Sequence, residues 1–360
     1  MDLTLTDEQQ MLADSARAFV ERECPPARVR EIAADPAGLD RDLWAAMASL
    51  GWPGLLVEEA HGGAGGGLVD LAVLCEALGR GPVPSPLVAT ATLAALPIAW
   101  AGTDEQRARW LPALAAGEAI GTLAVIEPGG RDEWDQPEMA GGPRLHGTKL
   151  LVPWAGAVDV VLVATADGLH LVEPCRGGVT SARHDDLGAD PLFALELRDA
   201  PAEPLGAGGD DHDAILGRAL DHAAVAQLAY AVGAAERALE LAVQHARDRH
   251  QFGRPIGAFQ AVAHRCVDMR TDLDACRYLA CRAAWALDEG GPADLEVGAA
   301  KAYANDAVRR IFGHAHQVHG AIGFSTEHDL HLYTRRAKSF ELTYGTTTRH
   351  LDRVATAMGL

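Results

Sequence analysis

Residues 249–260 read Arg-His-Gln-Phe-Gly-Arg-Pro-Ile-Gly-Ala-Phe-Gln, and this stretch decides how the C-terminal half of the chain is organised. It falls between the first two of four alanine-rich segments with helical periodicity, at about 213–247, 258–288, 293–318 and 327–341. Four long helices with modest connections predict an antiparallel bundle. We therefore assign residues 209–360 to a C-terminal four-helix bundle.

The residues before the bundle fall into two parts with different hydrophobic periods. Up to residue 118 the pattern is helical, and both Thr6-Asp7-Glu8-Gln9 and Thr103-Asp104-Glu105-Gln106 have the form of a capping box at a helix start. Residues 119–208 instead show short apolar runs, and Asp167-Gly168 between two of them predicts a tight β-hairpin. The expected fold is mainly α, with an N-terminal helical domain at 1–118, an inserted β domain at 119–208, and the bundle.

The composition excludes several classes of protein. A 360-residue chain with 48% apolar residues can bury a substantial core, and its net charge of −19 disfavours nucleic acid and anionic membranes as partners. The six cysteines are scattered without a C-x-x-C pair, so we expect reduced, mostly buried thiols. No export or transit peptide and no membrane-spanning apolar stretch is visible. These features predict a cytoplasmic protein.

Two segments carry a resemblance to a known family. The stretch at 249–260 and the later sequence Gln-Val-His-Gly-Ala-Ile-Gly-Phe at 317–324 closely resemble two C-terminal segments of the acyl-CoA dehydrogenases. Weaker matches at 59–65, 110–118, 127–129 and 147–149 follow in the family's order, so the resemblance covers essentially the whole chain. It implies the family's arrangement of a helical domain, a β domain and a four-helix bundle.

The resemblance also implies a cofactor, FAD, that lies between two subunits. In the family the ADP half of each FAD reaches the bundle of the neighbouring subunit. Arg249, Gln251 and Phe252 match positions that contact it there, and Gln317 with Gly320 lies in the matching second segment. Arginine suits phosphate, and glycine permits close backbone approach. A purely structural role for Arg249 and Gln251, as caps of the bundle loop, stays open.

The catalytic base of the family is missing at both positions where members carry it. Tyr344 stands where many members have the Glu that removes the α-proton while flavin takes the β-hydride. A phenol, with a reference pKa of about 10, is protonated near neutrality. Other members carry the Glu on the first bundle helix, where this chain has Ala223, and the following CoA-holding Arg is Ala224. Asp221 and His222 differ from Ala223 in helical phase and are expected to face elsewhere. We assign no catalytic residue.

The positions that hold the flavin ring in the family are altered as well. Ile126 replaces a Thr that donates to the flavin, and Leu151 replaces the Trp beside the ring. Pro153 replaces a hydroxyl residue and cannot donate a hydrogen bond. Arg131-Asp132 replaces the usual Ser-Asp after a shortened loop. The chain therefore lacks several contacts by which the family tunes its flavin.

Three further motifs have plainer interpretations. The glycine-rich residues 62–67 precede a helix but lack the Lys-Ser/Thr of a phosphate loop, which favours a structural turn. His314, His316 and His319 lack a matching carboxylate or cysteine, so packing is favoured and no metal is assigned. The run from Asp210 to Asp213 is interpreted as a solvated linker.

Residues that serve a neighbour's FAD are thus retained, whereas those that serve this chain's own flavin, base and CoA are altered. This division predicts a non-catalytic subunit of a heteromeric acyl-CoA dehydrogenase, paired with a homologous catalytic subunit that shares the FAD and binds most of the acyl-CoA. The family's heterotetrameric α2β2 members are associated with steroid side-chain degradation in actinobacteria. A self-sufficient flavoprotein with other chemistry, such as a flavin monooxygenase, and a flavin-free scaffold protein are the alternatives.

Overall fold

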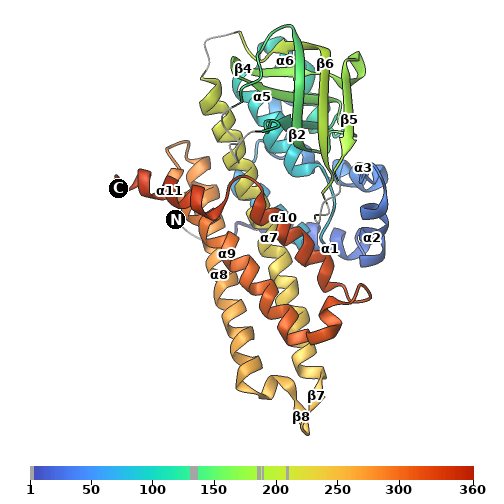
Figure 1. The fold of residues 1–360 in the computed structure, drawn as a ribbon, viewed down its shortest axis with the longest axis vertical. Coiled ribbons are helices and arrows are strands. Elements are labelled where there is room, and N and C mark those ends of the chain that lie inside the picture. Colours follow the sequence, from blue (N-terminus) through green and yellow to red (C-terminus); the bar gives the residue numbers. More distant parts are fainter. Residues whose placement is uncertain (1–3, 130–136, 185–187, 189, 208–210) are drawn as a thin grey trace.

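The computed structural model describes residues 4–129, 137–184, 188, 190–207 and 211–360. The chain forms a helical N-terminal part, a β part and a long helical C-terminal part (Figure 1). In this view the β part lies at the top and the bundle extends to the bottom, with the first helices beside their junction. The mainly α fold with an inserted β domain, expected from the sequence, is confirmed.

The N-terminal part begins its helices where the sequence signals predict. Thr6 and Thr103 each accept a bond from the backbone N–H three residues on, and the Gln at that position returns a bond to the Thr backbone. The helices are α1 (Asp7–Glu23), α2 (Pro26–Ala34), α3 (Arg41–Ser49), α4 (Leu68–Gly79), α5 (Leu96–Ala101) and α6 (Asp104–Ala115), with a π-helical segment η3 (Ala89–Ala95) leading into α5.

The β part is a mostly antiparallel sheet with the strand order β1-β3-β4-β6-β2, and β5 pairs with β6. The predicted hairpin is present, because Thr165 pairs with Gly168 across the turn between β3 and β4. The strands are β1 (Gly121–Ala124), β2 (Arg144–Pro153), β3 (Val160–Thr165), β4 (Gly168–Val172), β5 (Val179–Arg183) and β6 (Leu192–Pro204).

The C-terminal part contains the four predicted helices, with boundaries within a few residues of those expected. They are α7 (His212–Asp248), α8 (Gln260–Asp288), α9 (Asp294–His319) and α10 (Leu330–Leu342). A small hairpin of β7 (His250–Gln251) and β8 (Arg254–Pro255) joins α7 to α8, and a further helix, α11 (Thr347–Ala357), follows α10. The linker interpretation is wrong for Asp211, whose carboxylate accepts from Ala214 N and caps α7; residues 208–210 lie outside the described residues.

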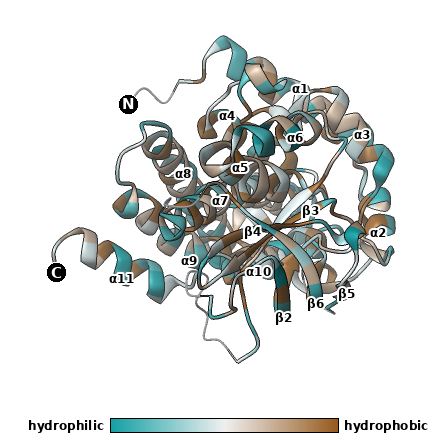
Figure 2. Ribbon diagram, turned by 90° about the horizontal axis from the view of Figure 1, so that it is seen from above, coloured by the Kyte–Doolittle hydropathy of each residue, from teal (hydrophilic) through white to brown (hydrophobic). Residues whose placement is uncertain are grey.

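Helices α4 and α7 cross closely through two glycines. A Cβ on Gly233 would lie 1.8 Å from the Glu76 carbonyl oxygen, and one on Gly79 would lie 2.0 Å from that of Tyr230. Only glycine allows this approach of two backbones. Figure 2 shows apolar residues gathered where α4, α5 and α7 meet, with polar residues toward the outside. The crossing therefore brings the N-terminal part directly onto the bundle core.

The glycine-rich residues 62–67 have the structural role that we favoured. The first two N–H groups of α4, at Leu68 and Val69, donate to the Asp288 carboxylate at 2.6 and 3.0 Å. Gly67 permits this, since a Cβ there would lie 2.6 Å from Asp288 Oδ2. A carboxylate from α8 thus caps the helix N-terminus that a phosphate would need.

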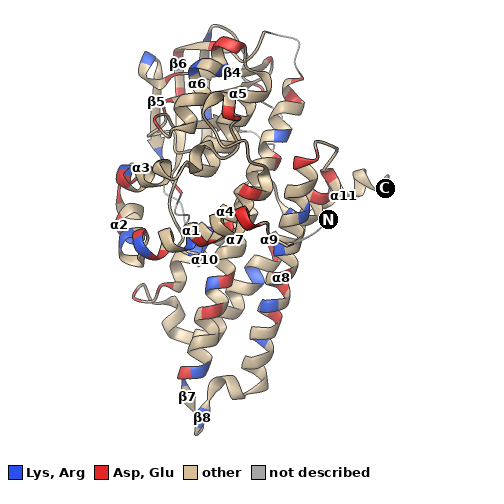
Figure 3. Cartoon of the chain, turned by 180° about the vertical axis from the view of Figure 1, so that it is seen from behind, with Lys and Arg blue, Asp and Glu red and all other residues tan. Residues whose placement is uncertain are grey.

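Charged side chains of both signs are spread along the bundle helices (Figure 3). Within the described ranges, no helix is long and apolar enough to cross a membrane. Among the same residues, no group of three or more His, Cys, Asp or Glu side chains is arranged to hold a metal ion.

Candidate functional site

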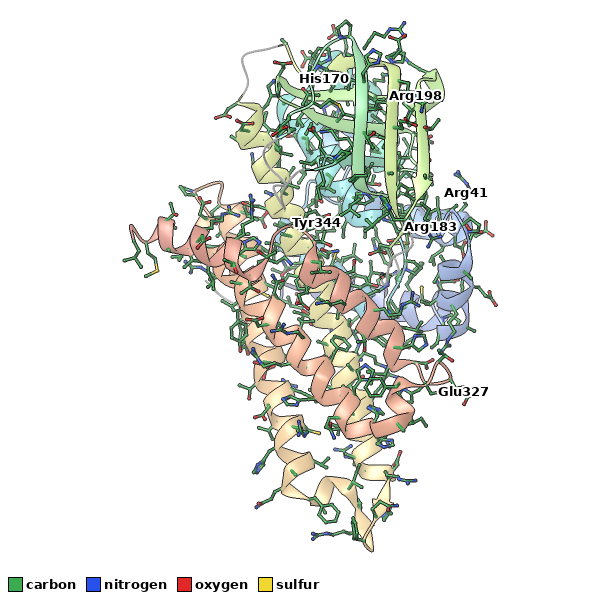
Figure 4. The ribbon with its side chains drawn as sticks, in the orientation of Figure 1. Arg41, His170, Arg183, Arg198, Glu327 and Tyr344 are labelled. Atoms are coloured by element: carbon green, nitrogen blue, oxygen red, sulfur yellow. The ribbon has the colours of Figure 1, made fainter. Side chains whose placement is uncertain are left out.

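Tyr344 lies where the three parts of the chain meet (Figure 4). Its side chain is 8% exposed and its backbone has a φ of 59°. It lines a cavity of only about 70 Å³, together with residues such as Leu78 of α4, Pro153 of β2 and Gln227 of α7. Sites for drug-sized ligands enclose roughly 300–1,000 Å³. The space beside the base position is therefore too small for a flavin ring or an acyl thioester.

Bulky polar side chains occupy the surroundings of Tyr344. Arg336 of α10 is 6% exposed, and its Nη1 donates to the Tyr230 hydroxyl at 2.7 Å and to the Val83 carbonyl at 3.0 Å. Its Nη2 lies 3.1 Å from Asp190 Oδ1. Burial raises the pKa values of both the Tyr344 and the Tyr230 phenols. Neither phenol can therefore accept a proton near neutral pH.

The backbone around Tyr344 is held by buried polar groups of the bundle. His350 Nε2 lies 2.9 Å from the Tyr344 carbonyl, and Asn305 donates to the Gly345 carbonyl at 3.4 Å. Lys301 Nζ donates to Asn305 Oδ1 and to the Phe340 carbonyl, both at 2.7 Å. Burial lowers the pKa of Lys301 to about 7. These bonds fix the segment in one conformation even though it carries no base.

The second base position, on α7, is also filled by structural contacts. Ala223 and Ala224 are buried, at 0% and 2% exposure. Asp221 forms an ion pair with Arg353 of α11, and His222 packs edge-on against Trp100 with ring centroids 5.1 Å apart. Both side chains thus have structural partners of their own.

Two of the altered ring positions, Leu151 and Pro153, lie at the irregular end of β2. The β2–β6 register shifts between Lys149 and Val152, and Leu151 in this irregularity has a φ of 53° and is 39% exposed. Trp154, three residues later, is instead buried and lines the cavity beside Pro153. The Ile126 carbonyl accepts a bond from the Leu150 N–H. The predicted position Arg131-Asp132 lies outside the described residues.

The weak sequence matches at 127–129 and 147–149 are joined by one buried contact. Lys149 is fully buried, and its Nζ lies 2.5 Å from Glu127 Oε1 and 3.0 Å from the Val125 carbonyl. Glu127 also accepts from the backbone N–H groups of Glu138 and Met139. These contacts therefore join the two motifs to each other and to the backbone at residues 138 and 139.

The predicted FAD-binding residues of the 249–260 stretch lie on the β7–β8 hairpin. Phe252 and Gly253 both have positive φ, at 54° and 79°, as a tight two-residue hairpin turn requires. Phe252 is 91% exposed, and Gln251 Nε2 donates to the His250 carbonyl. The Arg249 backbone N–H ends α7 by donating to the His245 carbonyl, and Arg249 is exposed. The hairpin thus presents an exposed cation and an aromatic ring at the bundle tip.

Gln317 and Gly320 lie at the C-terminal end of α9. Gly320 has a φ of 65°, which opens its backbone to close approach. Both residues line a groove of about 360 Å³ between α9 and α10, together with the exposed ring of Phe324. The ring of His319 stacks on that of His245 with centroids 4.8 Å apart. This stack places the end of α9 beside the end of α7, where Arg249 lies.

The predicted site residues therefore fall into two separate groups. Tyr344 lies near the upper end of the bundle in Figure 4, whereas the labels of β7 and β8 mark its far end in Figure 1, in the same orientation. The far-end group fits the ADP half of FAD, because it offers a cation, an aromatic ring and an open glycine backbone. The cavity beside Tyr344 does not fit the flavin ring.

The other sequence interpretations have mixed outcomes. His316 contacts Phe324 and His319 contacts His245, so these histidines pack against aromatic neighbours. All six cysteines are free, but only Cys24, Cys75 and Cys276 are buried and Cys175 is exposed. The expectation of mostly buried thiols was therefore only half right.

Sequence reasoning missed Arg336, Tyr230 and Asp190, which fill the space beside Tyr344. A signal existed for Arg336. It interrupts an otherwise apolar stripe of α10 that contains Leu332 and Phe340, each one helical turn away. A charged residue on a buried stripe indicates a specific partner.

Comparison with known proteins agrees with this architecture. Residues 6–118 match the acyl-CoA dehydrogenase N-terminal domain and residues 213–359 match the acyl-CoA dehydrogenase C-terminal domain. The acyl-CoA dehydrogenase IpdE2 of Mycobacterium tuberculosis is 33% identical over 93% of this chain and 92% of its own length. One solved structure, the ChsE4-ChsE5 complex of Mycobacterium tuberculosis, superposes with a TM-score of 0.90 at 30% identity, over 100% of this chain and 99% of the other.

A second solved structure, the Tcur3481-Tcur3483 steroid ACAD G363A variant, also gives a TM-score of 0.90, at 32% identity over 99% of both chains. The sequence matches cover both helical domains, and the structural matches cover the β part between them. This chain belongs to the acyl-CoA dehydrogenase family.

Proposed function

We propose that this chain is the non-catalytic subunit of a heteromeric, FAD-dependent acyl-CoA dehydrogenase. The observation that carries the proposal is the contrast between the two ends of the helical bundle. The base position is a buried Tyr344 beside a cavity of about 70 Å³, whereas the Arg249 hairpin is exposed and open. A chain with this contrast can serve a partner's cofactor but has no room for its own flavin ring.

In the assembly, the catalytic chemistry belongs to the homologous partner. FAD held there would supply the acceptor for the β-hydride of the acyl thioester, and the partner would supply the base and the acyl pocket. The residues of this chain bind and orient the ADP half. Arg249, Gln251 and Phe252 would hold its pyrophosphate and adenine end, and Gln317 with Gly320 would form the second wall. Charge-assisted bonds of this kind are the stronger class of hydrogen bond.

The partner and the substrate class are supported by the relatives. The ChsE4-ChsE5 structure is a complex named after two components, and the Tcur3481-Tcur3483 structure is described as a steroid ACAD. We therefore propose a homologous catalytic subunit as the partner, an α2β2 assembly, and an acyl-CoA with a steroid side chain as the substrate.

The test is to purify the chain alone and together with a co-expressed homologous partner. We expect the chain alone to be flavin-poor and inactive with any acyl-CoA and an artificial electron acceptor, and the complex to be yellow and active. A chain that alone retains FAD and reduces the acceptor would contradict the proposal and favour a self-sufficient flavoenzyme. Absence of FAD from every complex with a homologue would favour a scaffold protein.

A further inference from the structure

Three histidine rings, those of His245, His319 and His328, are in contact beneath the two segments that we assign to the ADP half of FAD, and a fourth histidine, His316, lies against Phe324 beside them. The rings of His245 and His319 stack with centroids 4.8 Å apart. The ring of His328 meets His319 edge-on at 4.7 Å, and His316 stacks on Phe324 at 4.6 Å. His245 belongs to α7, His316 and His319 belong to α9, and His328 lies in the loop before α10. The cluster therefore joins α7, which ends at the Arg249 hairpin, to α9, which ends at Gly320.

Each histidine in this cluster is tied to a backbone element of the site. The His245 carbonyl accepts the Arg249 N–H, and the His316 carbonyl accepts the Gly320 N–H. His319 Nδ1 lies 2.7 Å from the Ala315 carbonyl and so must donate, which leaves Nε2 as the unprotonated nitrogen in the neutral ring. His328 Nδ1 accepts the Leu330 N–H at the start of α10. The backbones of His245 and His316 therefore form the last hydrogen bonds of α7 and α9, directly before the two segments.

The observed contacts are those of neutral imidazoles. His319 is 5% exposed, and its Nε2 has no hydrogen-bond partner among the described residues. His328 Nδ1 can accept from Leu330 only when it is unprotonated. Burial lowers the pKa of His245, of His316 and of His319, and the neighbouring histidines add to this effect.

Charged groups near the cluster do not reverse the preference of these rings for the neutral form. Near the end of α7, the charge of Arg249 lowers the pKa of His245 and the charge of Asp248 raises it. His328 lowers the pKa of each of the other three histidines by charge repulsion. The neighbour from α10 is the neutral Thr334, whose Oγ1 lies 2.8 Å from His316 Nε2. A second positive charge within the stack would be repelled at short range in a buried place. Attraction to an exposed phosphate is weaker because solvent and salt screen it.

We propose that His245 and His319 are positioning residues that hold the Arg249 hairpin and the Gly320 turn in register for FAD only while their rings are neutral. This inference rests on the proposed function. Protonation opens the stack and loosens both segments, so the complex holds FAD less tightly once the pH falls below the ordinary titration range of histidine. The linkage predicts a loss of about tenfold in affinity per pH unit for each proton taken up on release of FAD.

The experiment measures the FAD dissociation constant of the intact complex by flavin fluorescence between pH 8 and pH 5.5. In parallel, the ring signals of His245 and His319 are followed by NMR in a complex in which only this chain carries labelled histidine. We expect affinity to be constant near pH 8 and to fall toward pH 5.5, and both rings to titrate below pH 6.5 in the FAD-bound complex.

Two variants separate positioning from general stability. His319→Phe keeps a flat ring against His245 but cannot take up a proton, so its affinity should match the wild type at pH 8 and vary less with pH. His146→Gln, which changes an exposed histidine of the β part, should keep the wild-type profile. If His319→Phe does not fold, the wild-type affinity profile and the ring titrations decide the question.

Several outcomes would overturn the inference. These are an affinity that is flat or rises toward low pH, rings that titrate near 6.5 in the FAD-bound complex, or a His319→Phe profile identical to the wild type. These outcomes leave the proposed function intact as long as the complex binds FAD at pH 8. A complex that binds no FAD at pH 8 would remove the proposed function and this inference together.

Discussion

Asp221 and Arg353 form a two-pronged ion pair in which both nitrogen–oxygen distances are 2.6 Å. Arg353 also donates to Asp294 at the start of α9, at 2.7 Å. The pair fastens α11 to α7, the helix that carries the second predicted base position. An acidic residue near the second base position is thereby committed to holding the C-terminus of the chain.

We predict that Arg353→Ala lowers the free energy of unfolding by about 3 kcal/mol, because it leaves the mostly buried Asp221 carboxylate without its partner. Arg270→Ala is the matched control. It removes one exposed pair within α8, with Asp274, and should change the stability by less than about 1 kcal/mol. Denaturant unfolding of the purified complex measures both. Equal effects of the two changes would show that the Asp221 pair has no special role.

A second prediction concerns pH. Burial lowers the pKa of His222 and of His350 to about 4, and both side chains are less than 5% exposed. The folded chain therefore binds fewer protons than the unfolded chain below pH 6.5, so stability is full above that pH and is lost as the pH falls toward 4. Each histidine should contribute a loss of about 2 kcal/mol between pH 6.5 and pH 5.

This loss can be separated from the titration of carboxylates by comparing the wild type with a variant that lacks one of the two histidines. Denaturant unfolding at pH 7, 6 and 5 gives the slope, and His222→Gln should make it shallower. The exposed His146→Gln change should leave the slope as it is. A constant unfolding free energy from pH 7 to pH 5 would contradict the assignment of these histidines as buried and neutral.

The parts of the fold that the sequence predicts are those with local signals. The two capping boxes and the Asp167-Gly168 hairpin each depend on residues within a few positions of one another. The long bundle helices follow from a period repeated over 25 residues or more. Such signals survive without knowledge of the tertiary structure, which is why the order and limits of the helices could be predicted.

What could not be predicted depends on residues far apart in the chain. Arg336 meets Tyr230 across 106 positions, and Arg353 meets Asp221 across 132. The irregularity at Leu151, which brings Trp154 to the cavity, depends on the register against β6. The base positions themselves were identified by resemblance, but the way they are filled required the structure.

Restoring the missing carboxylate should not restore catalysis. In Tyr344→Glu the carboxyl would be buried beside a cavity of about 70 Å³, so its pKa would rise and no acyl thioester could reach it. We expect no acyl-CoA oxidation by the chain alone and no gain by the complex. Tyr344→Gln is the matched uncharged control. A strong gain with Glu but not with Gln, in the acceptor assay, would show that the site is more complete than we conclude.

Arg249 should act on a flavin whose ring lies in the partner. Arg249→Ala removes a charge-assisted bond to phosphate, and we expect FAD affinity of the complex to fall roughly ten- to a hundredfold, or about 1.5–3 kcal/mol. Activity should fall with it and return with excess FAD, because the partner's base and acyl pocket are intact. The measurement is a titration of the apo complex with FAD.

Arg254→Ala is the control for charge in the same hairpin. Its guanidinium lies 4.1 Å from the Phe259 ring centroid and is used in that contact. We expect a small effect on FAD affinity. If the two alanine changes weaken FAD equally, the hairpin acts through its general positive charge and Arg249 has no specific contact with phosphate.

The number of flavins in the intact complex tests the central claim most directly. The complex is purified with saturating FAD, its subunits are quantified by amino-acid analysis, and FAD is released and counted by absorbance. Our account predicts two FAD molecules per α2β2 tetramer, because only the partner's two ring pockets can be filled. Four FAD molecules per tetramer would mean that this chain holds a flavin ring of its own, and would contradict the account.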